Sequence, residues 1–201
     1  MPLKKSAAGT RELFAQMQYL NLAEMRTFCQ EHNLSLYIHV AKAGGGLRRT
    51  GDRDRKDVVL RRIFDFAVHG RRTGPTTYDA AVVADGPLPA SLTARTRVRY
   101  GQYEKHNPAF VDALRRLTDG AFRTGMIARL VLRDFWTAGQ APTMRQLADA
   151  WLEAKAAHKK PRPEGAYLVD RWKGEAGPGW KQHRTQQARA ALTELARLTR
   201  D

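Results

Sequence analysis

The organisation of this chain is best predicted from residues 55–70, which read RKDVVLRRIFDFAVHG. Apolar side chains recur in this stretch at the spacing of a single helical face, at Val59, Leu60, Ile63, Phe64 and Ala67. The pattern predicts an amphipathic helix that buries these five side chains and leaves Arg61 and Arg62 off the buried face. Gly70 suits the end of this helix, because glycine readily adopts the left-handed conformation of a C-terminal cap.

Two helices and a hairpin are predicted on the N-terminal side of this segment. Residues 10–19 and 22–32 have helical apolar spacing, and Asn21 can cap the second of these helices. Residues 36–40 and 47–50 flank three consecutive glycines. This arrangement predicts a short β-hairpin with a glycine tip.

The segment that follows Gly70 has a different composition. Residues 71–94 are rich in Gly, Pro and Thr, and we expect them to form a connector that packs on the surface. Residues 95–100 alternate with a period of two, which predicts a strand that presents three arginines on one face, namely Arg95, Arg97 and Arg99. Residues 71–105 are therefore predicted to be a basic connector that contains a short strand.

Four helices are predicted in the last half of the chain, within residues 107–120, 124–139, 143–158 and 180–199. Asn107, Thr124 and Thr143 stand at the starts of the first three, where they can act as N-caps. The predicted fold is mainly α with small β elements, in which a helix–loop–helix unit at residues 1–70 is joined to a C-terminal helical bundle at residues 106–201.

The charge of the chain is its most informative global property. The formal net charge is +15 and the isoelectric point is near 10.5. The excess of basic residues is present in all three predicted ranges, so it belongs to the folded surface rather than to one tail. Such a surface attracts polyanions, and nucleic acid is the partner we expect. An acidic protein or a membrane surface are the alternatives.

Two segments of the N-terminal part carry a resemblance to a known family. The first segment begins with Leu22-Ala-Glu-Met25 and ends with Asn33-Leu34. The second segment is Lys56-Asp-Val-Val59-Leu60-Arg61-Arg62-Ile63. Together these segments resemble the SAP domain, a small helix–loop–helix module that binds DNA. Asn33 stands where the family prefers glycine, and the connection over residues 35–52 is longer than a SAP loop. The order of a SAP-like start, a basic connector and a helical part is also similar to that of bacterial SAP-containing proteins. The resemblance implies a duplex DNA partner, a preference for AT-rich DNA, and a role in chromosome organisation or repair.

Candidate contacts to nucleic acid gather around the start of the helix at residues 55–68. The N-terminus of a helix carries unpaired N–H groups and about half a positive charge, and cations placed there raise the potential that a phosphate meets. The candidate residues are Arg48, Arg49, Arg53, Arg55, Lys56, Arg61 and Arg62, together with Arg95, Arg97 and Arg99 and with Tyr37 as an aromatic that can stack on a base.

Each of these groups has a simpler interpretation. Asp52, Asp54 and Asp57 can neutralise the arginines near the helix start, and Asp52 or Asp54 can cap the helix. Arginines on a strand face can serve as the charged surface of an edge strand. Tyr78, Tyr100 and Tyr103 are further candidates for stacking. Phe135, Trp136 and Trp151 are expected in the core, and the basic residues near 159–162 are expected to form a polar loop.

No pattern in the sequence indicates an enzyme. The six histidines have no metal-ligand spacing, and residues 44–46 lack the Lys-Ser/Thr that completes a phosphate-binding loop. Cys29 lies on an apolar helix face and is expected in the core. We therefore expect no catalytic residue, no metal site and no cofactor.

The sequence thus predicts a nucleic-acid-binding protein that contacts duplex DNA mainly through phosphates, with weak sequence preference. The alternatives are a protein-interaction or oligomerisation module, which binds a partner or a second copy through its aromatic C-terminal helices, and an RNA-binding protein. No stretch approaches the roughly 20 apolar residues of a membrane helix. Lys4 and Lys5 precede no apolar run, so we expect no secretory signal and a cytoplasmic, nucleoid-associated protein.

Overall fold

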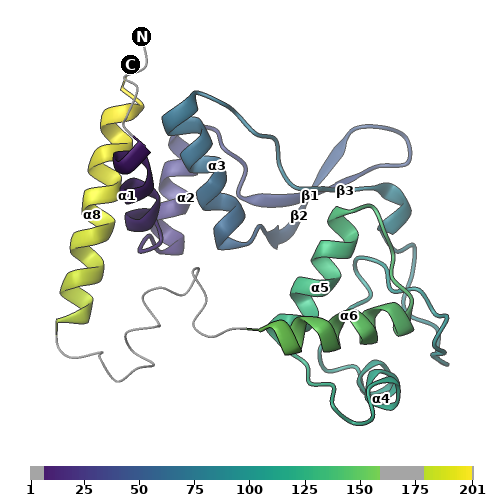
Figure 1. Ribbon diagram of the computed structural model, residues 1–201. Helices are drawn as coiled ribbons and strands as arrows, with labels where there is room; N and C mark the ends of the chain where they lie inside the picture. The colour runs from purple at the N-terminus through teal and green to yellow at the C-terminus, as the bar shows by residue number, and fades with distance from the viewer. Residues whose placement is uncertain (1–6, 159–178, 201) are drawn as a thin grey trace. The chain divides into compact units, whose positions relative to one another are not determined.

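The computed structural model describes residues 7–158 and 179–200, and these residues form two compact units with separate hydrophobic cores (Figure 1). Unit 1 takes its residues from Met1–Tyr37, Gly51–Pro75 and Lys159–Asp201, and unit 2 from Ile38–Thr50 and Thr76–His158. The described residues contain seven α-helices and one three-stranded sheet. The prediction of a mainly α fold with small β elements is therefore confirmed.

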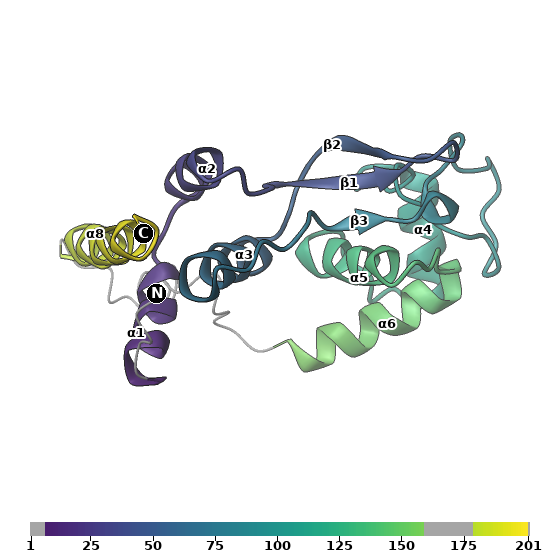
Figure 2. The same ribbon diagram turned by 90° about the horizontal axis from the view of Figure 1, so that it is seen from above.

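Unit 1 is helical. Its elements are α1 (Ala7–Met17), α2 (Leu22–Glu31), α3 (Lys56–His69) and α8 (Trp180–Leu198). Helix α3 packs against α1, α2 and α8, and α8 also packs against α1. Figures 1 and 2 show these four helices grouped together.

Unit 2 combines the sheet with three helices. Its helices are α4 (Pro108–Leu117), α5 (Met126–Thr137) and α6 (Met144–Ala157), and its strands are β1 (Tyr37–Ala41), β2 (Leu47–Arg53) and β3 (Thr77–Tyr78), followed by the short 3-10 helix η1 (Ala80–Val82). The strand order is β2-β1-β3, and β1 pairs with β3 in parallel (Figure 2). Helix α5 packs on β3, and α6 packs on both α4 and α5. The chain leaves unit 1 after Tyr37, within β1, and returns to unit 1 at Gly51, within β2.

The start of α2 forms as the sequence predicts. The Asn21 side chain accepts a hydrogen bond of 2.9 Å from the Glu24 N–H, and the Asn21 N–H donates to the Glu24 carboxylate over 2.7 Å. This reciprocal pair is a capping box, which satisfies two of the unpaired N–H groups at the helix start. Asn33 has a φ of 53°, so it takes the left-handed conformation that is common just after a helix.

Helix α3 is confirmed, with two corrections at its N-terminal half. All five predicted core residues of this helix are buried, and Gly70 has a left-handed φ of 64°. However, Arg62 is also buried, although its position was predicted to lie off the buried face. The N-cap residue is Arg55, with no side-chain cap hydrogen bond, so neither Asp52 nor Asp54 caps the helix.

The last helix packs differently from the grouping that the sequence suggested. Helix α8 buries Ala188, Ala191 and Leu195 in the core of unit 1. Arg184 of this helix donates through Nε to the Tyr19 carbonyl over 2.9 Å and pairs with the Glu24 carboxylate. The bundle of α4, α5 and α6 is therefore formed without α8. An apolar stripe shows that a helix face is buried, but it does not show which core the face covers.

The segment over residues 71–94 contributes to the core of unit 2. Tyr78 and Val82 are fully buried, so the prediction that this segment packs on the surface is wrong at these positions. The Tyr78 ring lies 5.0 Å from the Tyr100 ring and 5.9 Å from the Trp136 ring, between ring centroids. Strand β3 has only two residues, which is too short for a periodic pattern to reveal.

The strand predicted at residues 95–100 does not form as a continuous strand. This segment makes only isolated bridges, Arg97 with Thr143 and Tyr100 with Val83. It changes partner at Val98, whose N–H donates to the Pro142 carbonyl over 2.8 Å and whose carbonyl accepts from the Trp136 indole over 3.1 Å. Because the segment hydrogen-bonds to two loops and to a helix in turn, it cannot form the regular series of strand-to-strand hydrogen bonds that its alternating sequence predicted.

The helix starts of unit 2 follow the sequence in two cases of three. The Asn107 and Thr143 side chains accept hydrogen bonds from the N–H groups of Phe110 and Gln146, as N-caps. Thr124 does not cap α5, because Gly125 is its N-cap residue. None of the helices in the described residues is long and apolar enough to span a membrane.

The packing of α8 predicts a loss of stability that is confined to unit 1. Replacing Leu195 by Ala should destabilise unit 1 by about 2–5 kcal/mol, because the side chain is fully buried. Hydrogen exchange should become faster in α1 and α3 and stay unchanged in α4, α5 and α6. The exposed Thr193→Ala in the same helix serves as the control. Faster exchange confined to α4–α6 would contradict the packing of α8.

Candidate nucleic-acid interface

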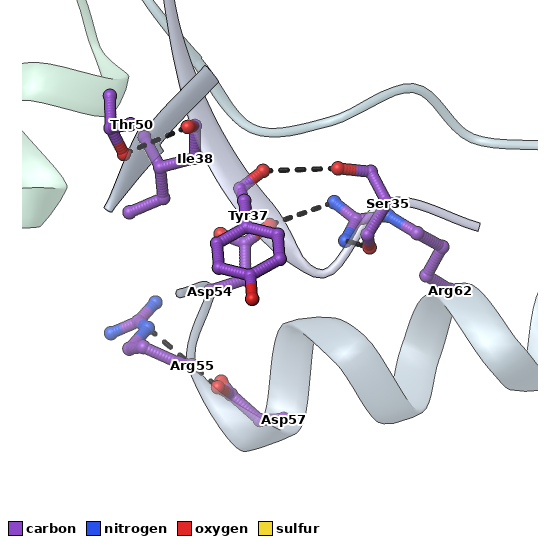
Figure 3. A network of polar contacts seen from close by, with 8 residues as sticks. All are labelled: Ser35, Tyr37, Ile38, Thr50, Asp54, Arg55, Asp57 and Arg62. Atoms are coloured by element: carbon purple, nitrogen blue, oxygen red, sulfur yellow. Dashed lines mark hydrogen bonds and ion pairs between the residues drawn. The ribbon is translucent and has the colours of Figure 1, made fainter. Parts of the chain in front are cut away.

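Arg62 lies at the centre of a buried polar network (Figure 3). Its Nη2 atom lies 3.0 Å from Oδ2 of Asp54, and the two side chains are 4% and 3% exposed. Its Nη1 atom donates to the Ser35 carbonyl. Asp54 follows β2 and its N–H donates to the Leu36 carbonyl over 3.0 Å, so the arginine of α3 binds the chain just before β1 and just after β2.

This network removes Arg62 from the predicted contact surface. A guanidinium that is desolvated and paired with a buried carboxylate serves the fold, because either charge left alone in the interior would be strongly unfavourable. The sequence placed Arg62 beside Arg61 as a surface cation, yet the side chain of Arg61 is exposed and that of Arg62 is not. The difference follows from the width of the buried face of α3, which includes position 62.

The cations at the start of α3 are also engaged within the protein. The Lys56 ammonium donates to the carbonyl of Gln18, which directly follows α1, where a positive charge interacts favourably with the helix dipole. Nε of Arg55 lies 3.7 Å from Oδ1 of Asp57. Both basic residues are half-buried. The entry to α3 is therefore less available to phosphates than the sequence predicted.

The candidate residues of β2 remain at the surface. Arg48, Arg49 and Arg53 are exposed, whereas Thr50 is buried and donates to the Ile38 carbonyl over 2.9 Å. The strand order makes β2 an edge strand of the sheet. Arg61 of α3 is likewise exposed, and its guanidinium carbon lies 5.5 Å from the centroid of the Phe14 ring.

The loop that joins β1 to β2 adds a cation that sequence analysis missed. Residues 42–49, which we name the hairpin tip, form eight consecutive exposed positions that include Lys42, Arg48 and Arg49. No Asp or Glu occurs between Tyr37 and Gly51. Lys42 directly precedes the predicted turn and Arg48 follows it. This placement is the signal in the sequence that identifies Lys42 as a candidate contact.

The second group of arginines stands elsewhere in unit 2. Arg95 and Arg97 are exposed and Arg99 is half-buried, while Val98 between them is fully buried. Arg97 donates to the Ala141 carbonyl over 2.9 Å, and the Arg99 N–H donates to the Gln102 side chain over 2.9 Å.

The tyrosines are more deeply packed than a stacking role requires. Tyr37 is half-buried against the core of unit 1, and Tyr78 is fully buried, which rules out stacking by Tyr78 in this fold. Tyr103 packs edge-on against Phe110, with 5.4 Å between ring centroids, and burial raises the pKa of its hydroxyl. Trp136 and Trp151 are core residues, as predicted, and Phe135 is partly buried against the same core.

The described residues contain no group of three or more His, Cys, Asp or Glu side chains that could hold a metal ion. Cys29 is buried in the core of unit 1, as predicted. Burial raises the pKa of its thiol from 9.0 to about 11, and the positive charge of Arg62 opposes this shift only in part. The basic residues near 159–162 lie outside the described residues.

Comparison of the chain with protein-family models, with curated proteins and with solved structures found no match. The resemblance to the SAP domain therefore remains a prediction from the residues of α2 and α3.

The network of Arg62 gives a prediction on stability. Replacing Arg62 by Met should lower the free energy of unfolding by about 3–5 kcal/mol, because Asp54 then stays buried without its partner. The neighbouring Arg61→Met removes the same charge from an exposed position and should cost less than about 1 kcal/mol. Urea denaturation of the two variants measures the difference, and equal costs would show that the ion pair is not a structural requirement.

The thiol of Cys29 gives a prediction on pH. Between pH 9 and about 11 the unfolded thiol loses its proton while the folded thiol keeps it. The unfolded state then binds fewer protons, so the free energy of unfolding falls as the pH rises through this range. The free energy of unfolding, measured by denaturation at a series of pH values, should fall more steeply with pH in the wild type than in Cys29→Ala above pH 9. Below pH 9 the two plots of this free energy against pH should run parallel. Parallel curves throughout would contradict the raised pKa.

Proposed function

We propose that the protein binds duplex DNA, mainly through its phosphates and with weak sequence preference, and that the hairpin tip makes the principal contact. The observation that carries this proposal is the run of eight exposed residues with three cations and no carboxylate. Lys and Arg side chains that neutralise phosphates release counterions from the DNA, which supplies most of the free energy of non-specific binding.

Two of the three charges at the hairpin tip are not used by the fold. Lys42 and Arg48 form no ion pair with another residue in the described ranges. The mutual repulsion of the cations at the tip opposes compaction unless a polyanion compensates it. Cations that do stabilise the fold include Arg62, Lys56 and Arg184.

Further support comes from the rest of the surface and from the resemblance. Arg53 and Arg61 are exposed in unit 1 and can add phosphate contacts there. The segments of α2 and α3 that resemble a SAP domain favour duplex DNA over RNA as the partner. On this proposal the protein is associated with the nucleoid and acts in chromosome organisation or repair.

A second candidate function is protein interaction. A groove between α5 and α6 favours it, since the groove is lined mainly by Val131, Phe135, Ala138, Ala150, Ala154 and Ala157. Apolar grooves between helices are frequent binding sites. Size-exclusion chromatography with light scattering, with and without DNA, distinguishes the two functions, because self-association without DNA favours the groove and a DNA-dependent complex favours the hairpin tip.

The proposed function predicts a change in the salt dependence of binding. Replacing Lys42, Arg48 and Arg49 together by Gln should weaken binding to duplexes of any sequence. The slope of log affinity against log salt should become shallower by about 2.7, which is 0.9 for each lost phosphate contact. Fluorescence anisotropy with a labelled duplex at several salt concentrations measures both effects.

A matched variant controls for the loss of net charge. Lys105, Arg116 and Arg129 are exposed in the same unit, and their joint replacement by Gln removes the same three charges. This control should leave the slope close to that of the wild type. Equal losses in both triple variants would show that only net charge matters and would remove the hairpin tip as the principal contact. Tighter binding to single-stranded DNA or RNA than to duplex DNA would reject the proposed partner.

A further inference from the structure

We infer that the hairpin tip enters the major groove of the duplex as a two-stranded ribbon, with its cations on the phosphates of the two groove walls. This inference rests on the proposed function and specifies how the same residues engage the DNA. It is carried by the extent of the strands, by the distribution of charge along the hairpin, and by a glycine that the protein itself does not require.

The far end of the hairpin has two strands only. Strand β3 pairs with β1 at His39 and Val40 and extends no further. Beyond Ala41 the chain turns through residues 42–46, where the Lys42 N–H donates to the Gly46 carbonyl over 3.0 Å and the Gly45 N–H donates to the Lys42 carbonyl over 3.0 Å. The two strands are therefore joined by a hydrogen-bonded turn rather than by an open loop.

The dimensions of such a ribbon suit one groove and not the other. Two paired strands lie about 4.8 Å apart, before their side chains are added. The major groove of B-DNA is about 12 Å wide and admits a two-stranded ribbon, whereas the minor groove is about 6 Å wide. In duplex RNA the major groove is deep and narrow, so a ribbon of this kind cannot reach its floor.

The charges are placed behind an uncharged end. Residues 43–46 are Ala-Gly-Gly-Gly, and the cations follow on both sides, with Lys42 after β1 and Arg48 and Arg49 in β2. Arg48 stands two residues behind Gly46, which is about 7 Å along a strand. This distance is close to the depth of the major groove, about 8.5 Å. Arg48 therefore comes level with the phosphates when the uncharged end approaches the base edges, whereas Lys42, which is paired with Gly46, lies nearer to that end.

Gly44 has no role that the described structure explains. Gly45 and Gly46 have φ values of 88° and 79°, which account for glycine at these two positions. Gly44 lies outside this left-handed region, and a Cβ atom at this position would meet nothing within 4 Å. A side chain there is compatible with the folded protein but would widen the leading end of the ribbon. A ligand that approaches the backbone closely gives a physical reason for glycine at position 44.

The groove is identified by dimethyl sulfate methylation of a duplex of about 20 base pairs that is saturated with the unaltered protein. Guanine N7 lies in the major groove and adenine N3 in the minor groove. We expect reduced methylation at guanine N7 and unchanged methylation at adenine N3. Protection of adenine N3 alone, or no protection of either atom on a duplex that anisotropy shows to be bound, would overturn the inference but leave the proposed function intact. A failure to bind the duplex would reject both.

A variant pair assigns the protection to the hairpin tip. Gly44→Leu should weaken binding to the duplex about tenfold, because it widens the end that enters the groove. Gly86→Leu is the control, because Gly86 is exposed in the same unit and lies beside Asp85. A Cβ atom added at Gly86 likewise meets nothing within 4 Å. Equal thermal unfolding midpoints of both variants and the wild type verify folding. Unchanged affinity of Gly44→Leu, with guanine N7 still protected, would show that another element enters the groove.

Discussion

The buried pairing of Arg62 with Asp54 is the interaction on which the N-terminal part of this structure depends. Two opposite charges with almost no exposure are stable only together, because each would be strongly unfavourable alone in a low-dielectric interior. The same guanidinium also binds the carbonyl of Ser35. One side chain of α3 therefore binds the chain both just before β1 and just after β2.

This pairing also decides which cations are available for a partner. Arg62 neutralises a buried carboxylate, Lys56 binds the end of α1, and Arg184 joins α8 to the α1–α2 junction. These three charges contribute to the formal +15 of the chain but stabilise the fold. The exposed cations include Arg48, Arg49 and Arg53 of β2 and Lys42 at the hairpin tip, and further exposed cations lie on other elements of both units. A cluster that looks continuous in the sequence is thus divided by burial into a structural part and a surface part.

The assembly of unit 1 from three separate segments has a consequence for how the chain is organised. Helix α8 is about as far from α1 in sequence as the chain allows, yet its small Ala188 and Ala191 side chains let it pack closely on the N-terminal helices. Unit 2 is formed by the chain that lies between these segments. The hairpin that we propose to bind DNA begins and ends in unit 1, while its tip belongs to unit 2.

The sequence alone determined the local features. Helical periodicity, the Asn21, Asn107 and Thr143 caps and the Gly70 terminator were all recognisable, because each depends on residues within one turn of the chain. Tertiary structure decided the rest. It buried Arg62, placed Tyr78 in a core, gave residues 95–100 two partners in place of one strand, and brought α8 to unit 1. These outcomes depend on contacts between residues far apart in sequence, and a local pattern carries no information about which distant surface will cover it.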